Sequence, residues 1–462
     1  MLERMRYGIV GAGPCGSIAA LLLLEAGYEV HLFDIDDNSE SSDDESKTNI
    51  KLMGGSTSPY DMNQLLIVNV KSSPASFYRS KLSGGFSNVW GATWGSLMAE
   101  NNQQLEKHYR LVTERVFRSL GISPDDGFTN GCRCLGFLDP ILAKIDFDRN
   151  LKFSKTQLAI NPSICSCVET GATSCAHGSV WNSKLMLEEC MKHKGFSFIS
   201  GVDITKIENV GDQLSLSYLS TTQFYDGITI AAGPLGSSEI LLNTFSGLNS
   251  IEISDTLMGY MPFYKFRLNS RHSGAFAFSQ FRFDVIFGRE NLSAHIQLYS
   301  HSEIYLDRML NKLPKIAHPV LKKFAGVILP HIGIALIYLD SKASNSLTIS
   351  KGRGGRELEI NILKPEEGSL GLRRKLWQTF RLLRVLPVVP LISWAKPGES
   401  YHLGAGGKDL LDDLGFVKVD TRISVAGSFA LTEILPGPIT HAAMAQSSRL
   451  VEKIVHQNLD SS

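Results

Sequence analysis

The sequence predicts an α/β fold, in which a three-layer domain with a parallel sheet is interrupted by an α+β domain built on an antiparallel sheet. Two glycine-rich turns, each placed between an apolar strand and a helix, predict the parallel-sheet domain; they lie within residues 7–33 and 227–243. Alternating strand patterns over residues 260–395, without such turns, predict the antiparallel substrate domain. We therefore expect residues 1–259 and 396–462 to form one discontinuous domain around this insertion.

Composition and charge exclude several other classes of protein. The chain has 462 residues, of which 43% are hydrophobic and 20% charged, as in a globular protein with a large core. Lysine plus arginine and aspartate plus glutamate each total 46, so no net field attracts nucleic acid. No apolar run reaches the roughly 20 residues that span a bilayer, and the start shows no secretory signal pattern. We therefore expect a cytoplasmic protein.

The first glycine turn has the spacing of a dinucleotide-binding unit. Gly11 permits a tight turn after the strand, Gly13 lets a pyrophosphate approach the backbone, and Gly16 lets helix and strand pack closely. The amino end of the following helix offers free N–H groups to phosphates. Asp34 ends the second strand and can accept from ribose hydroxyls, which favours FAD or NAD over a 2′-phosphorylated cofactor. The spacing predicts a Rossmann-like domain whose cofactor contacts are Gly11, Gly13, Pro14, Cys15, Gly16 and Asp34.

A second glycine-rich segment bears on the choice between FAD and NAD. Residues 79–91 read RSKLSGGFSNVWG, which resembles the signature of the glucose-methanol-choline family of flavin oxidoreductases. The resemblance implies that this loop runs under a flavin, because glycine lets bare backbone approach the ring. A plain hairpin turn is the alternative. The implied FAD contacts are Arg79, Lys81, Gly84, Gly85, Ser87 and Asn88.

Later segments extend the same resemblance to the carboxyl end. Residues 230–238 (IAAGPLGSS) are similar to the family strand that closes over the adenosine side of FAD, and residues 401–404 (YHLG) and 436–440 (PGPIT) resemble its last segments. Some members of the family bind flavin covalently through a histidine in the glycine-rich loop. Val89 takes that position here, so we expect non-covalent FAD. The further implied contacts are Ala232, Gly233, Gly427, Ser428, Ile439 and Thr440.

The resemblance also implies a catalytic histidine. His402 takes the position of the family residue that accepts the proton of a substrate hydroxyl while hydride passes to the flavin. A base that titrates near neutral pH can both accept and return a proton. The family places a second histidine or asparagine after the Pro-Gly turn; here that position is Pro438, and His441 is the candidate replacement. A structural role is the alternative for both histidines.

These features together predict an FAD-dependent oxidoreductase. The resemblance implies that it oxidises a hydroxyl group of a sugar, a polyol or a hydrophobic or lipid-linked alcohol to a carbonyl group. The electrons would pass to oxygen, a quinone or a protein, among which the sequence does not choose. Because Pro438 departs from the family pattern, two alternatives stay open: a redox-neutral flavoprotein of isomerase type, and a protein that keeps the FAD fold without catalysis.

A cysteine-rich insertion is expected within residues 130–180. Soft thiolates at close spacing can hold zinc or an iron-sulfur cluster. Cys-x-Cys is not the commoner spacing of zinc knuckles, however, so reduced structural thiols without a metal are the favoured interpretation and a redox disulfide is a third. Besides Cys132 and Cys134, the candidate ligands are Cys165, Cys167, Cys175 and His177.

Two basic amphipathic segments admit two interpretations. Residues 309–323 and 373–391 combine lysine and arginine with large apolar side chains. We favour core helices with a solvated basic face. The alternative is peripheral contact with a membrane interface, which would make a hydrophobic substrate natural. The acidic, serine-rich residues 36–47 are expected to form a solvated loop.

Overall fold

The fold is described from a computed structural model of the whole chain. It describes residues 5–36, 65–69, 76–88, 90–95, 105–127, 135, 138–139, 151–164, 178–266, 278–288, 292–300, 327, 329–352, 358–363 and 370–460. Several of the sequence predictions lie outside these residues. They concern Val89, the acidic residues after Asp36, the basic residues 309–323, and the cysteine cluster with Cys132, Cys134, Cys165, Cys167, Cys175 and His177.

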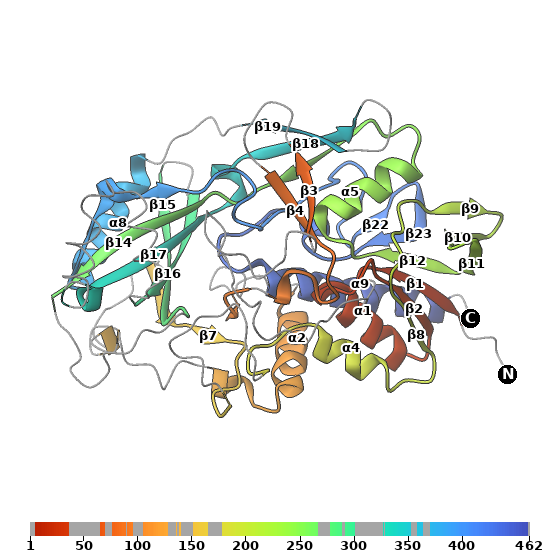
Figure 1. Cartoon of the computed structure of the whole chain (residues 1–462), viewed down its shortest axis with the longest axis horizontal. Helices are drawn as coiled ribbons and strands as arrows, with labels where there is room; N and C mark the ends of the chain where they lie inside the picture. The colour runs from red at the N-terminus through yellow and green to blue at the C-terminus, as the bar shows by residue number, and fades with distance from the viewer. Residues whose placement is uncertain are drawn as a thin grey trace.

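A six-stranded sheet forms the centre of one half of the molecule (Figure 1). In spatial order its strands are β22 (Phe416–Val417), β23 (Asp420–Val425), β12 (Gly227–Ile230), β1 (Arg6–Val10), β2 (Glu29–Phe33) and β8 (Phe196–Ile199). All pair in parallel except β22, which pairs antiparallel with β23. The parallel strands are short apolar runs because both faces of the sheet are covered.

Two different layers cover the two faces of this sheet. Packed on one face are the helices α1 (Pro14–Glu25), α4 (Lys184–Cys190) and α9 (Ile439–Asp460). On the other face lie α5 (Gly233–Thr244) and two antiparallel sheets, made of β9 (Glu208–Val210), β10 (Gln213–Tyr218) and β11 (Thr221–Tyr225), and of β13 (Ser250–Ser254), β18 (Ser346–Lys351) and β19 (Leu358–Leu363). The result is a three-layer arrangement with the parallel sheet in the middle.

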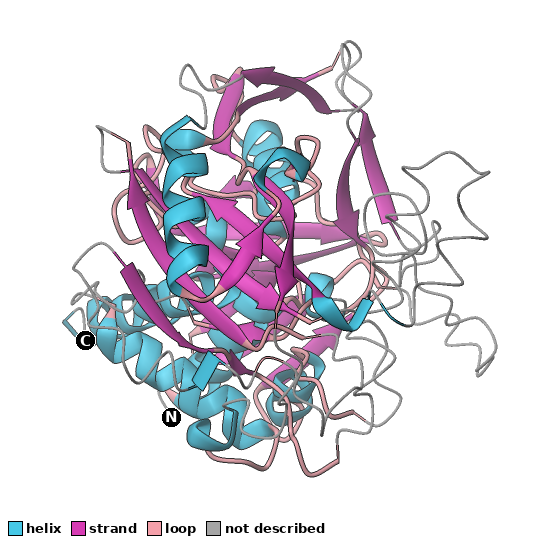
Figure 2. Cartoon of the chain, turned by 90° about the vertical axis from the view of Figure 1, so that its left-hand side faces the viewer, coloured by secondary structure: helices cyan, strands magenta, loops and turns pink. Residues whose placement is uncertain are grey.

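A seven-stranded antiparallel sheet forms the other half of the molecule. Its strands are, in spatial order, β20 (Val385–Pro387), β14 (Met258–Lys265), β17 (Ile332–Leu339), β16 (Leu292–Tyr299), β15 (Phe281–Phe287) and β6 (Leu151–Lys155), with β21 (Ser393–Trp394) also paired to β14. Helix α8 (Leu370–Leu382) covers the outer face of this sheet, as Figure 2 shows from the side of the helix.

The two faces of the seven-stranded sheet differ in character, because side chains alternate along a strand. On β15, Phe281 and Phe283 are buried in the core shared with Phe380 of α8. Arg282 and Asp284 alternate with these phenylalanines and are also buried, at 3% and 2% exposure, on the opposite face. This inner face, which is turned toward the parallel-sheet half, therefore carries polar and charged side chains out of contact with solvent.

Short elements link the two halves. These are the hairpin of β3 (Leu65–Asn69) and β4 (Ser76–Ser80), the pair of β5 (Thr93–Trp94) and β7 (Gln157–Leu158), and the helix α2 (Glu106–Ser119). Helix α2 packs on α9 through an apolar stripe that includes Val112 and Val116.

None of the helices in the described part of the chain can span a membrane, because each is too short or too polar to cross a bilayer. Helix α8 packs Leu376 into the core, as predicted, while Trp377 and Leu382 of the same helix are exposed. The helix predicted over residues 373–391 ends at Leu382, however, and residues 385–387 form β20. Contact of that exposed face with a membrane stays a prediction.

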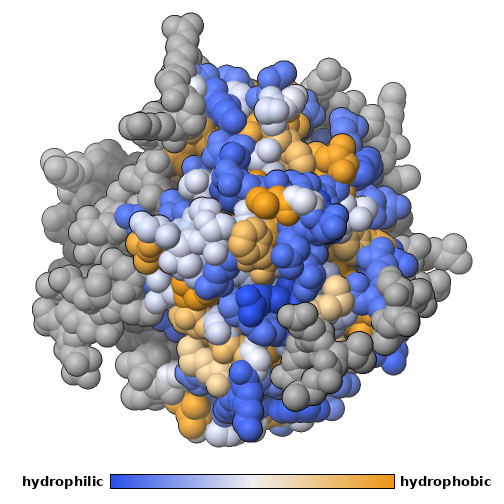
Figure 3. Space-filling model, turned by 90° about the vertical axis from the view of Figure 1, so that its right-hand side faces the viewer, coloured by the Kyte–Doolittle hydropathy of each residue, from blue (hydrophilic) through white to orange (hydrophobic). Residues whose placement is uncertain are grey.

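On the face that carries β9 to β11, apolar residues are scattered among hydrophilic ones, which is ordinary for a protein surface (Figure 3).

The attachment of α8 to the sheet can be tested with Phe380→Ala. Phe380 has no exposed surface and packs against Phe263 and Phe283, so the truncation leaves a cavity and should lower the free energy of unfolding by about 3–5 kcal/mol. Trp377→Ala on the exposed side of α8 is the matched control, and should cost less than about 1 kcal/mol, mainly its contact with Arg381. If urea denaturation shows that both variants lose the same free energy of unfolding, this packing is contradicted.

Candidate functional site

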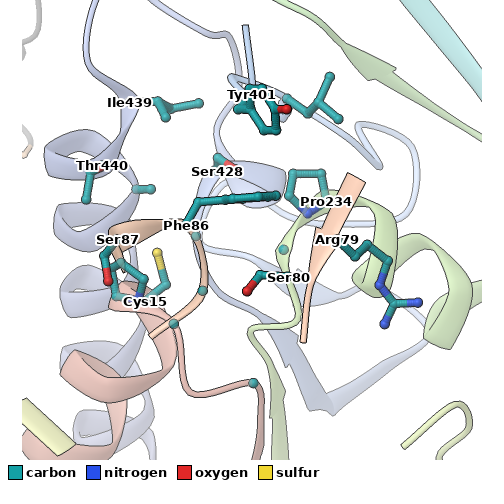
Figure 4. Close-up of a pocket in the computed structure, with 18 of the residues that line it drawn as sticks. Cys15, Arg79, Ser80, Phe86, Ser87, Pro234, Tyr401, Ser428, Ile439 and Thr440 are labelled. Atoms are coloured by element: carbon teal, nitrogen blue, oxygen red, sulfur yellow. The ribbon is translucent and has the colours of Figure 1, made fainter. Parts of the chain in front are cut away.

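A cavity of about 440 Å³ lies between the two halves. One side is formed by the turns that directly follow four parallel strands, at Gly11, Asp34, Ala231 and Ala426. The other side is the inner face of the seven-stranded sheet. In Figure 4 the loop with Phe86, the loop with Tyr401 and the start of α9 converge on it. Ligands of α/β proteins bind at the carboxyl ends of parallel strands, so this cavity is the candidate site.

The first glycine turn is held by close backbone contacts. Gly11 has a φ of 109° and its N–H donates to the carbonyl oxygen of Phe33 at 2.7 Å. A Cβ on Gly16 would lie 1.9 Å from the carbonyl oxygen of Gly11, so helix α1 can approach the strand only with glycine there. A Cβ on Gly13, in contrast, would meet no protein atom within 4 Å, and Gly13 lines the cavity. Gly11 and Gly16 thus serve the fold, whereas Gly13 leaves space for a ligand.

Asp34 stands at the edge of this turn. Its carboxylate accepts from the backbone N–H of Ala12 at 2.6 Å and from that of Asp36 at 3.0 Å. Burial raises the pKa of Asp34, although these hydrogen bonds oppose the shift. The carboxylate therefore holds the turn in place and still faces the cavity, where its remaining lone pairs can accept from a ligand.

The second glycine-rich segment forms a tight loop beside the first. Gly84 and Gly85 have φ of 91° and 55°, and residues 85–88 form a short 3₁₀ turn. Asn88 donates to the carbonyl oxygens of Ser83 at 3.0 Å and Gly85 at 2.9 Å, so its amide braces the loop from behind. Ser87 receives a hydrogen bond from the N–H of Ser183 at 3.0 Å and lines the cavity.

Arg79 and Cys15 line the cavity, but other contacts occupy their polar groups. The Arg79 guanidinium forms an ion pair with Glu239 of α5. Burial raises the pKa of the Cys15 thiol to about 12, so it stays protonated at neutral pH. Cys15 lies against Gly427, where a Cβ would come within 3.0 Å of its sulfur. Both side chains therefore hold neighbouring elements together at the site.

The structure brings most of the predicted cofactor contacts together. Those that line the cavity are Gly11, Gly13, Pro14, Cys15, Asp34, Arg79, Gly85, Ser87, Ala232, Gly233, Gly427, Ser428, Ile439 and Thr440. Outside the lining are Gly16, Lys81, Gly84 and Asn88. Of these four, Gly16 and Asn88 act on the backbone of residues that do line the cavity.

His402 faces the cavity from the loop after β21. Its ring stacks on Tyr338 with a centroid distance of 4.9 Å and an interplanar angle of 15°. Burial, and to a smaller degree the charge of His295, lowers the pKa of His402 to about 4. The imidazole is therefore neutral near pH 7 and can accept a proton.

A buried carboxylate fixes the loop that carries His402. Asp255, at 1% exposure, accepts from the N–H of Gly398 at 2.9 Å and from the hydroxyl of Ser400 at 2.8 Å. Ser400 in turn accepts from the N–H of His402 at 3.0 Å. The intervening Tyr401 has a φ of 58°. This network holds the His402 backbone in place.

His441 lies outside the cavity lining. Its Nε2 is within 3.0 Å of both the hydroxyl of Thr113 and the carbonyl oxygen of Tyr109. The ring packs against Trp94 and Tyr109, at centroid distances of 4.6 and 4.7 Å. Burial lowers the pKa of His441 to about 4. These contacts join α9 to α2 and lie outside the residues that line the cavity.

The sequence analysis missed the wall of the cavity opposite the glycine turns. It consists of side chains from the inner face of the seven-stranded sheet, namely Met258 and Tyr260 of β14, Tyr299 of β16, and Leu336 and Tyr338 of β17. The only signal was the alternation along these strands, which does not tell which face lines a cavity. This part of the inner face is therefore mainly aromatic and aliphatic, and its polar groups are the hydroxyls of the three tyrosines.

The described part of the chain contains no metal-binding cluster. No group of three or more histidine, cysteine, aspartate or glutamate side chains is arranged there to hold a metal ion. Cys165, Cys167, Cys175 and His177 lie outside these residues. Zinc or an iron-sulfur cluster thus has no support from the described structure.

The fold and its cavity define a three-layer α/β protein with a ligand site where parallel strands meet an antiparallel sheet. No protein-family model matches the chain, and no curated protein matches it in sequence. In structure it is similar to pyridoxine 4-oxidase from Mesorbium loti, with a TM-score of 0.61 and 13% identity over 98% of this chain and 99% of that one. The likeness establishes a shared fold along the whole chain.

The different roles of two glycines can be tested by substitution. Gly13→Ala places a methyl group in the cavity without touching protein, so stability should be unchanged while the affinity for added FAD falls at least about tenfold, measured by flavin fluorescence. Gly16→Ala forces helix α1 from its strand and should instead lower the urea midpoint. Full FAD affinity in folded Gly13→Ala would show that no cofactor approaches this turn.

Asp255 should give the fold a pH dependence of predictable sign. Burial raises the pKa of Asp255 from 3.8 to about 6, so between these values the folded protein binds more protons than the unfolded chain. The contribution of Asp255 to stability therefore falls as pH rises through this window, by roughly 3 kcal/mol in total. Urea denaturation at several pH values should show that the free energy of unfolding falls more steeply with pH in the wild type than in Asp255→Asn. Parallel curves for the two proteins would contradict this role of Asp255.

Proposed function

We propose that the chain binds FAD non-covalently and oxidises the hydroxyl group of a hydrophobic alcohol to a carbonyl group, with His402 as the base. The observation that carries this proposal is the convergence of two glycine turns and a neutral histidine on one cavity. The shared fold with pyridoxine 4-oxidase supports an oxidoreductase. The ordered segments described from the sequence support membership of the glucose-methanol-choline family.

The residues around the cavity fit a dinucleotide. Gly13 leaves open the space into which a side chain would extend, beside the amino end of α1, where backbone N–H groups favour phosphate. Asp34 faces the same end of the cavity, where it can accept from ribose hydroxyls. Gly85 and Ser87 come from the loop beside Gly13. We propose that these residues hold the pyrophosphate and adenosine of FAD, with the flavin toward His402.

His402 has the position and the protonation state of a base. Bound FAD supplies the acceptor for the hydride that leaves the alcohol carbon. Because Nδ1 of His402 is buried, Nε2 is the nitrogen that can meet a substrate hydroxyl in the cavity. It accepts the hydroxyl proton there, and Tyr338 stacked on the ring keeps the imidazole in this orientation. Such proton transfer typically contributes about 10²–10⁴-fold in rate.

The wall of the cavity favours a hydrophobic alcohol over a sugar or a polyol. Met258, Tyr260, Leu336 and Tyr338 present thioether, aromatic and aliphatic surface. A polyol has several hydroxyls that lose water on binding, and each needs a partner to offset that cost. An apolar alcohol needs only one polar contact, which His402 supplies. The acceptor of the electrons stays open among oxygen, a quinone and a protein.

A redox-neutral reaction of isomerase type is the second candidate. Pro438 stands where the family carries a second polar group, and His441 is turned into the contact between α9 and α2. If nothing else supplied that group, net alcohol oxidation would be slow. The two candidates differ when substrate is added without oxygen. Alcohol oxidation leaves the flavin reduced and bleached, whereas a redox-neutral reaction forms product without lasting bleaching.

Replacement of His402 tests the assignment of the base. His402→Ala should keep the flavin absorption spectrum and lower the rate of flavin reduction by hydrophobic alcohols about 10²–10⁴-fold, measured by anaerobic stopped-flow absorbance. The control is His456→Ala, because His456 is an exposed histidine of α9 outside the cavity lining. The flavin of this variant should be reduced at the wild-type rate. Colourless folded protein that takes up no added FAD would refute the proposal, and product formed without lasting bleaching would favour the isomerase.

A further inference from the structure

A buried carboxylate and imidazole lie side by side behind the proposed catalytic base. Asp284 of β15 and His295 of β16 are directly opposite each other in the sheet and are 2% and 0% exposed. Nδ1 of His295 and a carboxylate oxygen of Asp284 are 2.5 Å apart. Both side chains project from the inner face of the seven-stranded sheet, and the function proposed above does not use them.

The carboxylate fixes the proton on this imidazole. An ionised carboxylate can only accept hydrogen bonds, so Nδ1 of His295 carries the hydrogen and donates it to Asp284. In a neutral ring Nε2 is then an acceptor. It is fully buried and has no hydrogen-bond partner among the described residues. A buried acceptor without a partner is uncommon in native proteins and needs an explanation, such as a bound water or a functional role.

His402 offers the complementary group. Its Nδ1 is also buried and without a partner in the described part of the chain. Tyr338 is paired with His295 across β16 and β17, and its ring lies 6.4 Å from His295 and 4.9 Å from His402, centroid to centroid. For Nε2 of His402 to act as a base, Nδ1 must carry the hydrogen and needs an acceptor.

The imidazole of His295 also lies against the turn before α9. Gly437 has a φ of 110°, and a Cβ there would come within 2.9 Å of Cγ of His295. The next residue is Pro438, which can neither donate nor accept through a side chain. A histidine from the antiparallel sheet thus occupies the space beside a turn that itself brings no polar side chain.

We propose that Asp284, His295 and His402 form a proton relay, in which His295 accepts from Nδ1 of His402 through one bound water, because neither nitrogen has a direct partner among the described residues. This inference rests on the proposed function for its catalytic meaning. In the resting state, Asp284 keeps the hydrogen of His295 on Nδ1, and His295 keeps the hydrogen of His402 on Nδ1. The relay thereby leaves Nε2 of His402 free to face the substrate. Asp284 and His295 are positioning residues, since neither lines the cavity.

The relay also accommodates the charge that the reaction creates. When Nε2 of His402 takes the hydroxyl proton, the hydrogen on Nδ1 moves to Nε2 of His295. His402 is then neutral again, and the protonated His295 is paired with the Asp284 carboxylate. Charge on His295 lowers the pKa of His402, so protonation of both rings at once is disfavoured. When the electron acceptor later takes up the two electrons, the proton returns by the same path to Nε2 of His402 and leaves with them.

The tautomer of His402 is the direct test, and it needs no substrate. In ¹⁵N-histidine-labelled holoenzyme, nuclear magnetic resonance should show His402 protonated on Nδ1 in the wild type. His295→Phe removes the acceptor and should move the hydrogen to Nε2. His295→Gln keeps an acceptor oxygen and should restore the Nδ1 tautomer. The matched control is His108→Phe, which also removes a buried histidine paired with a carboxylate, here Glu452, but outside the cavity lining.

Kinetics give the second readout. His295→Phe should lower kcat about 10²-fold with little change in KM, and should have almost no further effect in His402→Ala. A wild-type His402 protonated on Nε2, or a tautomer unchanged in His295→Phe, would overturn the relay even if the enzyme oxidises alcohols. The expected tautomers in a protein that reduces no flavin would uphold the relay and refute the proposed function instead.

Discussion

Bare backbone contact between the first glycine turn and its neighbours determines where the rest of the site can lie. The carbonyl oxygen of Gly11 sits where a side chain of Gly16 would begin, and a Cβ on Gly11 would lie 2.5 Å from the carbonyl oxygen of Ala231. These contacts press the amino end of α1 onto the ends of β1 and β12. The open space at Gly13, the approach of Gly85 to Gly13 and the approach of Gly427 to Cys15 depend on that closeness.

The glycine turns were predictable because their cause is local. A positive φ at Gly11 and the contact at Gly16 follow from residues within six positions of each other, and the sequence shows them as spacing. The same holds for the helix after Ala232. The place of His402 beside the cavity was expected from the resemblance alone, because the distant Asp255 and Tyr338 hold its loop and its ring. Lys81, Gly84 and Asn88 show the limit of this reasoning, because a motif does not tell which of its residues face the ligand.

The cavity wall could not be predicted because its cause is long-range pairing. Whether Tyr338 faces the cavity depends on the register of β17 against β14 and β16, which the strand patterns do not state. Strand β6 joins the same sheet from more than a hundred residues before β15. A strand such as residues 281–287, with Arg282 and Asp284 between phenylalanines, is typical of a half-exposed strand, yet in the fold both of its faces are buried.

The polar inner face of this sheet has a physical explanation in the properties of His402. Burial that keeps this imidazole neutral also makes it a weak proton acceptor, since the protonated ring is poorly solvated there. A base in such a place needs a neighbouring negative charge that does not compete for the substrate. Asp284 meets this condition because His295 separates it from the cavity. The sheet buries a carboxylate at a cost to the fold, and under the proposed relay the gain lies in the transition state of the proton transfer rather than in stability.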